Sequence, residues 1–472
     1  MERGLQEVEV RGVALDRFAE VIGPVRTEQF LSLAASSRER LAGRRVINVN
    51  STATGGGVAE LLQTLLAHAR GVGIDTRWLV IEGDPAFFAI TKRIHNHLYG
   101  AAGDGGPLGF AEREHYEATM RRNEKQLVAF VRPGDVVVLH DPQTAGLAPA
   151  LLGAGVTVVW RCHVGIDTAN AFSEEGWSFL QRYLDNAHAY VFSRAQFAPS
   201  WIDRERLAVI APSIDPFSAK NAPIAASHAT QLLQAVGLLS GSDGLPTLSF
   251  TRRDGTSGVV RCRVDLLDTG PPPPAAVPVV LQASRWDAMK DMKGVMLGFA
   301  DADTDAHLVL AGPESRGVAD DPEADDILRD CHETWARLPV VVRSRIHLAC
   351  VPMDDGDEAA TVVNALQRHA TVVVQKSLAE GFGLTVTEAM WKARPVVASA
   401  VGGIVDQVVP GETGWLVDAD DIAGYAAAVC ALLADPPAAE HMGAAGYARA
   451  HAEFLGDRHL MQWARLFERL SA

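Results

Sequence analysis

The sequence predicts an α/β protein of two doubly wound domains, and three observations support this fold class. Short runs rich in β-branched residues alternate with segments of helical periodicity along most of the 472 residues. Those runs are apolar at consecutive positions, which is typical of parallel strands covered on both faces. The alternation stops over residues 217–276, which contain four consecutive prolines, and then resumes. We therefore expect a first domain at 1–216, an insert and linker at 217–276, and a second domain at 277–454, with a final helix at 455–472 packing back on the first.

Composition excludes several classes of function. The chain carries 43 basic and 58 acidic residues, a formal charge of −15, which disfavours an extended nucleic-acid surface. Its five cysteines include no C-x-x-C pair, which argues against a zinc knot or a disulfide framework and fits a reducing compartment. The charged N-terminus does not resemble a signal peptide, and no apolar run reaches the roughly 18 residues of a membrane span. We expect a cytoplasmic protein without a nucleic-acid or membrane partner.

The first domain is expected to begin with a mostly helical segment at 1–43. A strand at 45–50 then leads through Gly55, Gly56 and Gly57 into a helix at 58–70. A glycine-rich loop between a strand and a helix N-terminus can hold an anion, although a tight turn without ligand is the alternative. The loop lacks the Gly-Lys-Ser/Thr of a P-loop and the spacing of a dinucleotide fingerprint, which disfavours an ATPase or a dehydrogenase. The further strands expected here are 76–82, 135–140, 156–162, 189–193 and 207–211.

Polar side chains of this domain fall where a ligand is expected. Lys92, His95 and Asn96 share one helix face beside the aromatic pair Phe87 and Phe88, a combination that suits a carbohydrate. An ordinary exposed helix is the alternative. The strands 135–140 and 156–162 each end in a polar loop, and the second loop begins with His163 and ends with Asp167. Ligands of open α/β sheets bind at such strand ends, so a ligand-binding role for His163 is as well supported as a structural one.

The first strand of the second domain ends in a cationic loop. Arg285 and Lys290 could there neutralise a diphosphate, the first through a bidentate fork and the second as a point charge. The alternative is a surface ion pair with Asp287 or Asp291, which would contribute little to stability. The further strands expected are 307–311, 345–350, 371–375, 395–399 and 414–417.

The stretch 371–403 has the most specific pattern in the chain. A strand is followed by a loop containing Glu380, Gly381, Phe382 and Gly383, and then by a helix at 384–393 that carries Glu388. The glycines let the backbone approach a ligand, and the amides at the helix start can bind a phosphate or sugar oxygen. Glu380 could accept hydrogen bonds from a sugar, and Glu388 from a ribose. The alternative is a solvated Glu388 and a Glu380 that interacts with the helix dipole.

The sequence SLAEGFGLTVTEAM followed by ARPVVASAVGGI resembles the donor-binding signature of retaining glycosyltransferase family four. That resemblance implies the GT-B fold, in which two Rossmann-like domains face each other across a cleft. Further segments, among them NVNSTATGGGVAELLQ, VIEGDPAFFAITKRIHNHLYG, VVWRCHVGIDTAN, SIDPFSAKN and SRWDAMKD, are similar to trehalose synthases that use a nucleoside-diphosphate glucose, and to the related retaining trehalose phosphorylases. The region 236–275 is longer than expected for the family.

The resemblance implies roles for particular residues. The catalytic set would be His163, Arg285, Lys290 and Glu380. Donor binding would fall to Gly56, Gly57, Arg285, Lys290, Glu380, Gly381, Phe382, Gly383, Leu384 and Glu388. Acceptor binding would fall to Lys92, His95, Asn96 and Asp167. We expect the acidic pair, the cationic pair and the histidine to share one cleft.

The implied activity is retaining glucosyl transfer from a nucleoside-diphosphate glucose to free glucose, which forms trehalose. Phosphorolysis of trehalose is the nearest alternative, and a non-catalytic nucleotide-sugar-binding regulatory protein is an alternative of another class. The resemblance implies no cofactor and no metal, and related enzymes suggest a homodimer. The sequence leaves the nucleotide base, UDP-glucose or ADP-glucose for example, undetermined.

Overall fold

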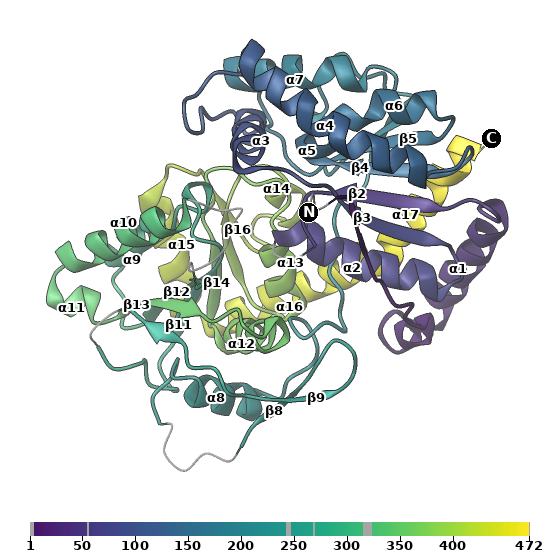
Figure 1. The fold of residues 1–472 in the computed structure, drawn as a ribbon. Coiled ribbons are helices and arrows are strands. Elements are labelled where there is room, and N and C mark those ends of the chain that lie inside the picture. Colours follow the sequence, from purple (N-terminus) through teal and green to yellow (C-terminus); the bar gives the residue numbers. More distant parts are fainter. Residues whose placement is uncertain (1–3, 54–55, 242–246, 268–269, 315–322, 472) are drawn as a thin grey trace. The chain divides into compact units, whose positions relative to one another are not determined.

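The computed structural model describes residues 4–53, 56–241, 247–267, 270–314 and 323–471, which form two compact units (Figure 1). The first unit comprises Met1–Ser213, Glu380–Phe382 and Phe454–Ala472, and the second comprises Ile214–Ala379 and Gly383–Glu453. Each unit is built on a seven-stranded sheet with helices packed on it. The predicted α/β class with two Rossmann-like domains is confirmed.

The sheet of the first unit has the order β1-β3-β2-β4-β5-β6-β7, and its strands are parallel except for β1. The prediction of a mostly helical segment at 1–43 is confirmed by the helix Phe18–Arg40. The edge strand β1 was not predicted, because three residues are too few to show periodicity. The other strands lie within the predicted runs. The strands are β1 (Gln6–Val8), β2 (Val46–Asn50), β3 (Thr76–Val80), β4 (Val136–His140), β5 (Thr157–Cys162), β6 (Ala189–Phe192) and β7 (Leu207–Val209).

Helices cover both faces of this sheet. In β2, Ile47 and Val49 point into the larger core, whereas Val46 points to the opposite face, as the period of two requires. On that opposite face α17 lies beside α1, although the two helices are about 420 residues apart in the chain (Figure 1). The helices are α1 (Phe18–Arg40), α2 (Gly56–Gly71), α3 (Pro85–Leu98), α4 (Phe110–Phe130), α5 (Asp141–Thr144), α6 (Ala148–Gly153), α7 (Ala171–Leu184) and α17 (Gly456–Ser471), with short 3-10 turns η1 (Leu15–Arg17), η2 (Ala145–Leu147) and η3 (Ala195–Phe197).

The sheet of the second unit has the order β10-β13-β12-β11-β14-β15-β16, with β10 antiparallel at one edge. Its parallel strands are mostly apolar and buried, as predicted, except for the partly exposed edge strand Trp415–Val417. The strands are β10 (Asp265–Leu266), β11 (Val279–Ala283), β12 (His307–Pro313), β13 (Ile346–Val351), β14 (Val372–Gln375), β15 (Val396–Ser399) and β16 (Trp415–Val417). The helices are α8 (Ala226–Ala235), α9 (Met292–Ala300), α10 (Ala324–Arg337), α11 (Val340–Arg343), α12 (Gly356–His369), α13 (Leu384–Trp391), α14 (Ile404–Gln407), α15 (Ile422–Ala434) and α16 (Pro436–Glu453), and η4 (Ala288–Lys290) is a 3-10 turn.

The region predicted as insert and linker belongs to the second unit. Its helix α8 packs on α12. An antiparallel hairpin of β8 (Ser249–Thr251) and β9 (Ser257–Val259) lies within this region, where no strand was predicted. Each strand has only three residues, with exposed ends around one buried residue, so neither shows an apolar run that could have indicated it.

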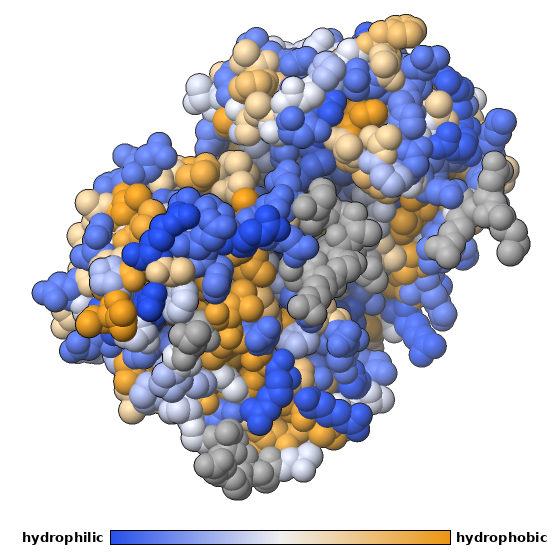
Figure 2. Space-filling model, turned by 60° about the vertical axis from the view of Figure 1, so that its left-hand side comes forward, coloured by the Kyte–Doolittle hydropathy of each residue, from blue (hydrophilic) through white to orange (hydrophobic). Residues whose placement is uncertain are grey.

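Surface features are dispersed. On the face shown in Figure 2, hydrophilic and hydrophobic side chains are interspersed. The most exposed large apolar side chains, Phe110, Val341 and Val25, lie on three different helices. Among the described helices none is by itself long and apolar enough to cross a membrane, and α15 and α16 reach that length and hydropathy only as a pair bent by 105°.

A buried ion pair ties β2 to β4 in the first unit. Asp135 is 2% exposed and accepts hydrogen bonds from the Arg45 guanidinium at 2.6 and 3.0 Å and from the backbone N–H groups of Arg45 and Arg132, each at 2.9 Å. Burial by itself would raise the pKa of Asp135, but these hydrogen bonds outweigh it and lower the pKa below its ordinary value. The Asp135 carboxylate therefore stabilises the fold fully at a pH above the pKa of a carboxyl group in the unfolded chain. This contribution is lost as the pH falls through the pKa of Asp135 in the folded protein.

We expect Asp135→Ala to lower the free energy of unfolding by about 3–5 kcal/mol at pH 7, because it leaves the buried Arg45 without its carboxylate. The matched control is Asp75→Ala, which removes a half-exposed carboxylate 2.8 Å from Arg77 and should cost at most about 1 kcal/mol. Urea unfolding of both variants measures the difference. Equal losses of unfolding free energy in the two variants would show that the buried Asp135–Arg45 pair stabilises the protein no more than an exposed pair does.

Candidate functional site

The candidate site of the first unit lies where β4 and β5 end. The two strands pair in parallel register with His140 opposite Arg161, so the residues that follow them are neighbours. The backbone N–H of His163 donates to Asp141 Oδ1 at 2.8 Å, and His163 Nε2 lies 3.2 Å from His140 Nδ1. The two imidazole rings stack at 16°. Asp141 has a φ of 62°, which is uncommon for a residue other than glycine and occurs often at functional sites.

The electrostatics of these strand ends keep both histidines neutral. Burial, followed by the charge of Arg161, lowers the pKa of His140 to about 3 and that of His163 well below its ordinary value. Burial also lowers the pKa of Arg161 to about 9, which leaves this guanidinium charged at neutral pH. For Asp141, burial raises the pKa to about 7, against the opposing effects of the His163 N–H and Arg161.

The C-terminal end of α3 belongs to the same region. Lys92, His95 and Asn96 are half-buried on this helix, and the His95 ring packs edge to face on Tyr99 with centroids 5.0 Å apart. Tyr99, four residues after His95, is a site candidate that the sequence interpretation missed. Phe87 is fully buried and stacks on Tyr116, so the expectation that it helps to form a sugar-binding face is wrong.

Two further predicted regions of this unit are the loop that carries Asp167 and the start of α2. Asp167 is partly exposed and forms an ion pair with Arg194. Gly56 begins α2 and Gly57 follows it, whereas Gly55 lies outside the described residues.

The loop Glu380–Phe382 packs with the first unit. A Cβ on Gly381 would lie 2.2 Å from the carbonyl oxygen of His163 and 3.1 Å from the hydroxyl of Tyr99. Phe382 is buried and packs edge to face on Phe454, and Glu380 is 9% exposed. Gly381 is therefore required here for close contact with protein backbone, and this loop brings Glu380 into the region of His163 and Tyr99.

The cationic loop of the second unit follows β11. Asp287 caps η4 by accepting from the backbone N–H of Met289 at 2.8 Å, and it also accepts from Arg285 Nη2 at 3.1 Å. This is the ion pair expected under the structural alternative, but 46% of the Arg285 side chain stays exposed and can reach a ligand. Lys290 ends η4, and its half-buried side chain lies at the same strand end.

The loops after β11 and β14 are joined directly. The backbone N–H of Leu378 donates to the Met289 carbonyl at 2.8 Å. Lys376, which the sequence interpretation missed, is buried and donates to Asp291 at 2.5 Å and to the Ala419 carbonyl at 2.7 Å. The cationic loop is thus held beside the loop that leads to Glu380.

Glu388 lies in a buried polar cluster on α13, a helix that begins at Leu384 after Gly383 in left-handed conformation (φ 86°). Its carboxylate lies 3.7 Å from Lys220 Nζ and 3.5 Å from Gln367 Nε2. Because Glu388 is only 7% exposed, the alternative of a solvated helix carboxylate is wrong.

A second lysine, also missed from the sequence, belongs to this cluster. Lys392 donates to Asn221 Oδ1 at 2.9 Å and to the Glu388 carbonyl at 3.1 Å. Burial lowers the pKa of Lys392 to about 7, although the neighbouring Glu388 carboxylate opposes this shift. Lys392 follows Glu388 by one helical turn, and that spacing was the available signal.

The structure thus groups His163, Glu380, Gly381 and Tyr99 in one unit, and Arg285, Lys290 and Glu388 belong to the other. The expectation that both sets share one cleft stays a prediction. Among the described residues, no group of three His, Cys, Asp or Glu side chains is arranged to hold a metal ion.

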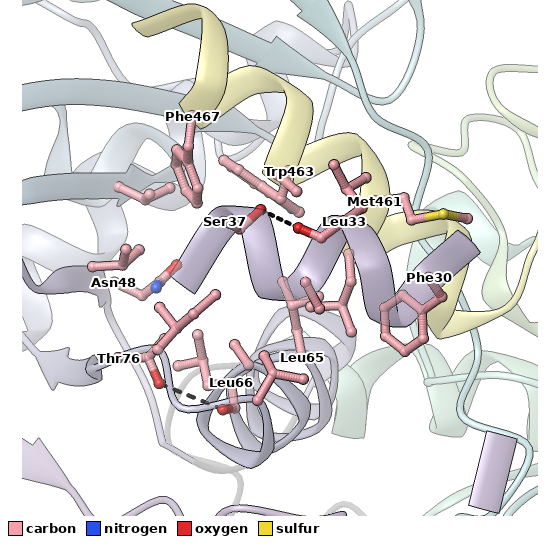
Figure 3. A pocket seen from close by; sticks show the side chains of 18 residues that line it. Phe30, Leu33, Ser37, Asn48, Leu65, Leu66, Thr76, Met461, Trp463 and Phe467 are labelled. Atoms are coloured by element: carbon pink, nitrogen blue, oxygen red, sulfur yellow. Dashed lines mark hydrogen bonds between the residues drawn. The ribbon is translucent and has the colours of Figure 1, made fainter. Parts of the chain in front are cut away.

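A separate cavity of about 60 Å³ lies in the first unit between α1, α2, α17 and the sheet (Figure 3). Ligand sites for molecules of substrate size enclose roughly 300–1,000 Å³, so this cavity is too small for a sugar nucleotide. Most of its lining is apolar, including Phe30, Leu65 and Trp463, whereas Asn48 and Thr76 contribute polar side chains.

Gly381→Ala is expected to detach the 380–382 loop, because the new Cβ meets the His163 backbone, which cannot rotate away as a flexible side chain could. Hydrogen exchange of residues 163–166 and 378–384 should become faster. Gly356→Ala, where a Cβ meets nothing within 4 Å, is the control and should leave exchange unchanged. Unaltered exchange in Gly381→Ala would contradict the close packing.

Comparisons with known proteins identify the family of the chain. Residues 48–199 match the family described as trehalose synthase, N-terminal domain, and residues 357–449 match glycosyl transferases group 1. Trehalose synthase of Rubrobacter xylanophilus is 35% identical over 437 residues, which cover 91% of this chain and 92% of that protein. Trehalose phosphorylase of Pleurotus pulmonarius is 25% identical over 87% of this chain and 55% of its own length.

A solved structure supports the fold. An α,α-trehalose-phosphate synthase (UDP-forming) from Burkholderia vietnamiensis aligns with a TM-score of 0.64 and 15% identity, covering 91% of this chain and 99% of that one. At this identity the likeness shows the fold alone, which is GT-B. The match to the Rubrobacter enzyme covers nearly the whole of both chains, and it therefore shows the family to which this chain belongs. The chain belongs to the trehalose synthase family of GT-B glycosyltransferases, and it is a hexosyltransferase.

Proposed function

We propose that this protein transfers glucose from a nucleoside-diphosphate glucose to free glucose with retention of the anomeric configuration, and so forms trehalose. The observation that carries the proposal is the similarity to a trehalose synthase over 91% of the chain, which spans both units. Five of the proposed site residues lie in the loops that follow strands, where open α/β sheets bind ligands: His163, Asp167, Arg285, Lys290 and Glu380. Glu388 lies on α13, and Lys92, His95 and Asn96 lie on α3.

The donor is proposed to bind the second unit. Arg285 and Lys290 flank η4 at the end of β11, and together they offer two positive charges to the departing diphosphate. Preorganised charges that meet negative charge as it develops supply a large part of the catalysis in group transfer. Glu388 would accept hydrogen bonds from the ribose hydroxyls, and its carboxylate lies 3.7 Å from Lys220 Nζ.

The reacting sugars are proposed to lie near His163 and Glu380. Because His163 is neutral, it would orient a sugar through hydrogen bonds and would not act as a permanent cation. Glu380 would position the donor sugar, while Lys92, His95, Asn96 and Asp167 would serve the acceptor. The acceptor hydroxyl would attack from the face that the diphosphate leaves, and the leaving phosphate would take its proton. Closure of the site would exclude water.

Phosphorolysis of trehalose is the second candidate, and the similarity to a trehalose phosphorylase supports it. The buried cluster around Glu388 favours the nucleotide-dependent reaction, because a phosphorylase has no ribose for this carboxylate to bind. The identity to the phosphorylase is also lower than that to the synthase.

A product assay tests the proposal. Glucose with UDP-glucose or ADP-glucose should yield trehalose and free nucleoside diphosphate, and EDTA should leave the rate unchanged, since the proposed neutralisation of the diphosphate uses Arg285 and Lys290 and no metal. Trehalose formed only from glucose 1-phosphate and glucose would assign phosphorolysis instead. Inhibition by EDTA would refute the proposal that the diphosphate is neutralised without a metal ion.

Arg285→Ala should lower kcat by about 100- to 1,000-fold, the usual loss when one electrostatic contact to a developing anion is removed. Arg285→Lys should recover only part of the rate, because a point charge replaces a bidentate fork. Arg329→Ala is the control, because Arg329 lies on the exposed face of α10, where it forms an ion pair with Asp326 at 2.9 Å. Unaltered turnover in Arg285→Ala would remove Arg285 from the donor site.

A further inference from the structure

We propose that Asn48 and His140 are positioning residues that hold His163 as the neutral imidazole protonated on Nε2, so that its Nδ1 offers a lone pair to a sugar hydroxyl. The inference rests on the proposed function for the presence of a sugar at His163. It adds two residues that do not touch substrate and act through a third.

Three neighbouring strands bring these side chains together. Strands β2 and β4 pair in parallel register with Asn48 opposite Val138, and β4 pairs with β5, which ends just before His163. His140 Nε2 lies 3.0 Å from Asn48 Oδ1, and His140 Nδ1 lies 3.2 Å from His163 Nε2. Asn48 and His140 are 4% and 2% exposed, so solvent does not compete for these contacts.

The chemistry of the three groups fixes the direction of both hydrogen bonds. An amide oxygen only accepts, so Asn48 Oδ1 requires the proton of His140 to be on Nε2. A neutral imidazole carries one proton, and His140 Nδ1 must then accept the hydrogen bond from His163. His163 is thereby protonated on Nε2, and its Nδ1 has a lone pair.

The surroundings exclude the doubly protonated form. The buried Arg161 guanidinium donates to His459 Nε2 at 3.2 Å and to the Ile210 carbonyl at 3.3 Å, and it lies over the ring of Trp463. Burial, followed by this positive charge, lowers the pKa of His140, His163 and His459. The chain of hydrogen bonds therefore has one proton per ring.

Core packing does not account for Asn48. Its side chain lines an otherwise mainly apolar cavity (Figure 3), where a buried amide is unfavourable unless it is hydrogen-bonded. A leucine would fit the apolar lining better. The hydrogen bond with His140 explains why an amide side chain lies at this position.

The tautomer matters for a sugar substrate. A hydroxyl bound to His163 Nδ1 must donate its hydrogen, which orients the oxygen lone pairs away from the ring. The opposite tautomer would present an N–H at the same place and would demand a hydroxyl that accepts. Losing the correct tautomer should therefore lower the rate of the chemical step more than it weakens substrate binding.

The test uses Asn48→Leu, which removes the acceptor at similar volume, and Asn48→Asp, which keeps an acceptor oxygen facing His140. Thr76→Val is the matched control, because Thr76 lines the same cavity and lies outside the hydrogen-bond chain. Thermal unfolding establishes that each variant is folded. Histidine-selective 15N labelling, with signals assigned through His140→Gln and His163→Gln, then reports the proton position on each ring.

In the native protein the His163 Nδ1 signal should be that of an unprotonated nitrogen, and Asn48→Leu should move the proton of His163 wholly or partly to Nδ1. Asn48→Leu should also lower kcat at least about 10-fold with donor KM within about 2-fold, while Asn48→Asp should restore the native tautomer and most of the rate. Thr76→Val should match the native enzyme in both measurements.

A protonated His163 Nδ1 in the native protein, or a native rate in Asn48→Leu, would overturn the proposal. Loss of rate in Asn48→Leu with the native tautomer retained would overturn it as well, because the effect would then be structural. Failure of the proposed function gives a different result: the native protein would form no trehalose, while the 15N spectrum would still show the tautomer.

Discussion

The carboxyl ends of the parallel strands are the constraint on which the candidate site depends. In a parallel sheet these ends meet at one edge, so hydrogen-bond register decides which loops become neighbours. The pairing of His140 with Arg161 sets the contact between His140 and His163. In the second unit, β11 and β14 pair in the same way, and the Leu378–Met289 hydrogen bond joins their loops. Side-chain chemistry is added to positions that backbone pairing has already fixed.

Burial and, after it, a buried positive charge determine the protonation states around that edge. Arg161 is 1% exposed, and its guanidinium is held by His459 and the Ile210 carbonyl with the Trp463 ring alongside. Both His459 and Trp463 come from α17, the last helix of the chain. This helix therefore does more than cover apolar strands, because its side chains contact a guanidinium that is buried in the core. Burial, and after it this charge, lowers the pKa of His140 and His163 and keeps both rings neutral.

The second unit also buries charged groups, and here groups of opposite charge lie close together. Glu388 is a buried carboxylate. Lys220, which is 168 residues earlier in the chain, approaches the carboxylate, and Lys392, one helical turn later, donates to the Glu388 backbone carbonyl. Desolvation penalises each charge separately, and mutual attraction offsets part of the penalty. The arrangement keeps Glu388 in one place without exposing it to solvent. A preorganised hydrogen-bond acceptor of this kind is what a ribose clamp requires.

The sequence by itself determined the α/β class, most strands, the family and the loop and helix that carry Glu380 and Glu388, because apolar runs and glycine-rich turns are local signals. Strands of two or three residues, such as β1, gave no such signal. The tertiary structure alone decided that Phe87 is core, that Gly381 packs on the His163 backbone, and that Asn48, His140 and His163 form one chain. These contacts join residues that are 23 to more than 200 positions apart, and no local periodicity encodes which strand lies next to which.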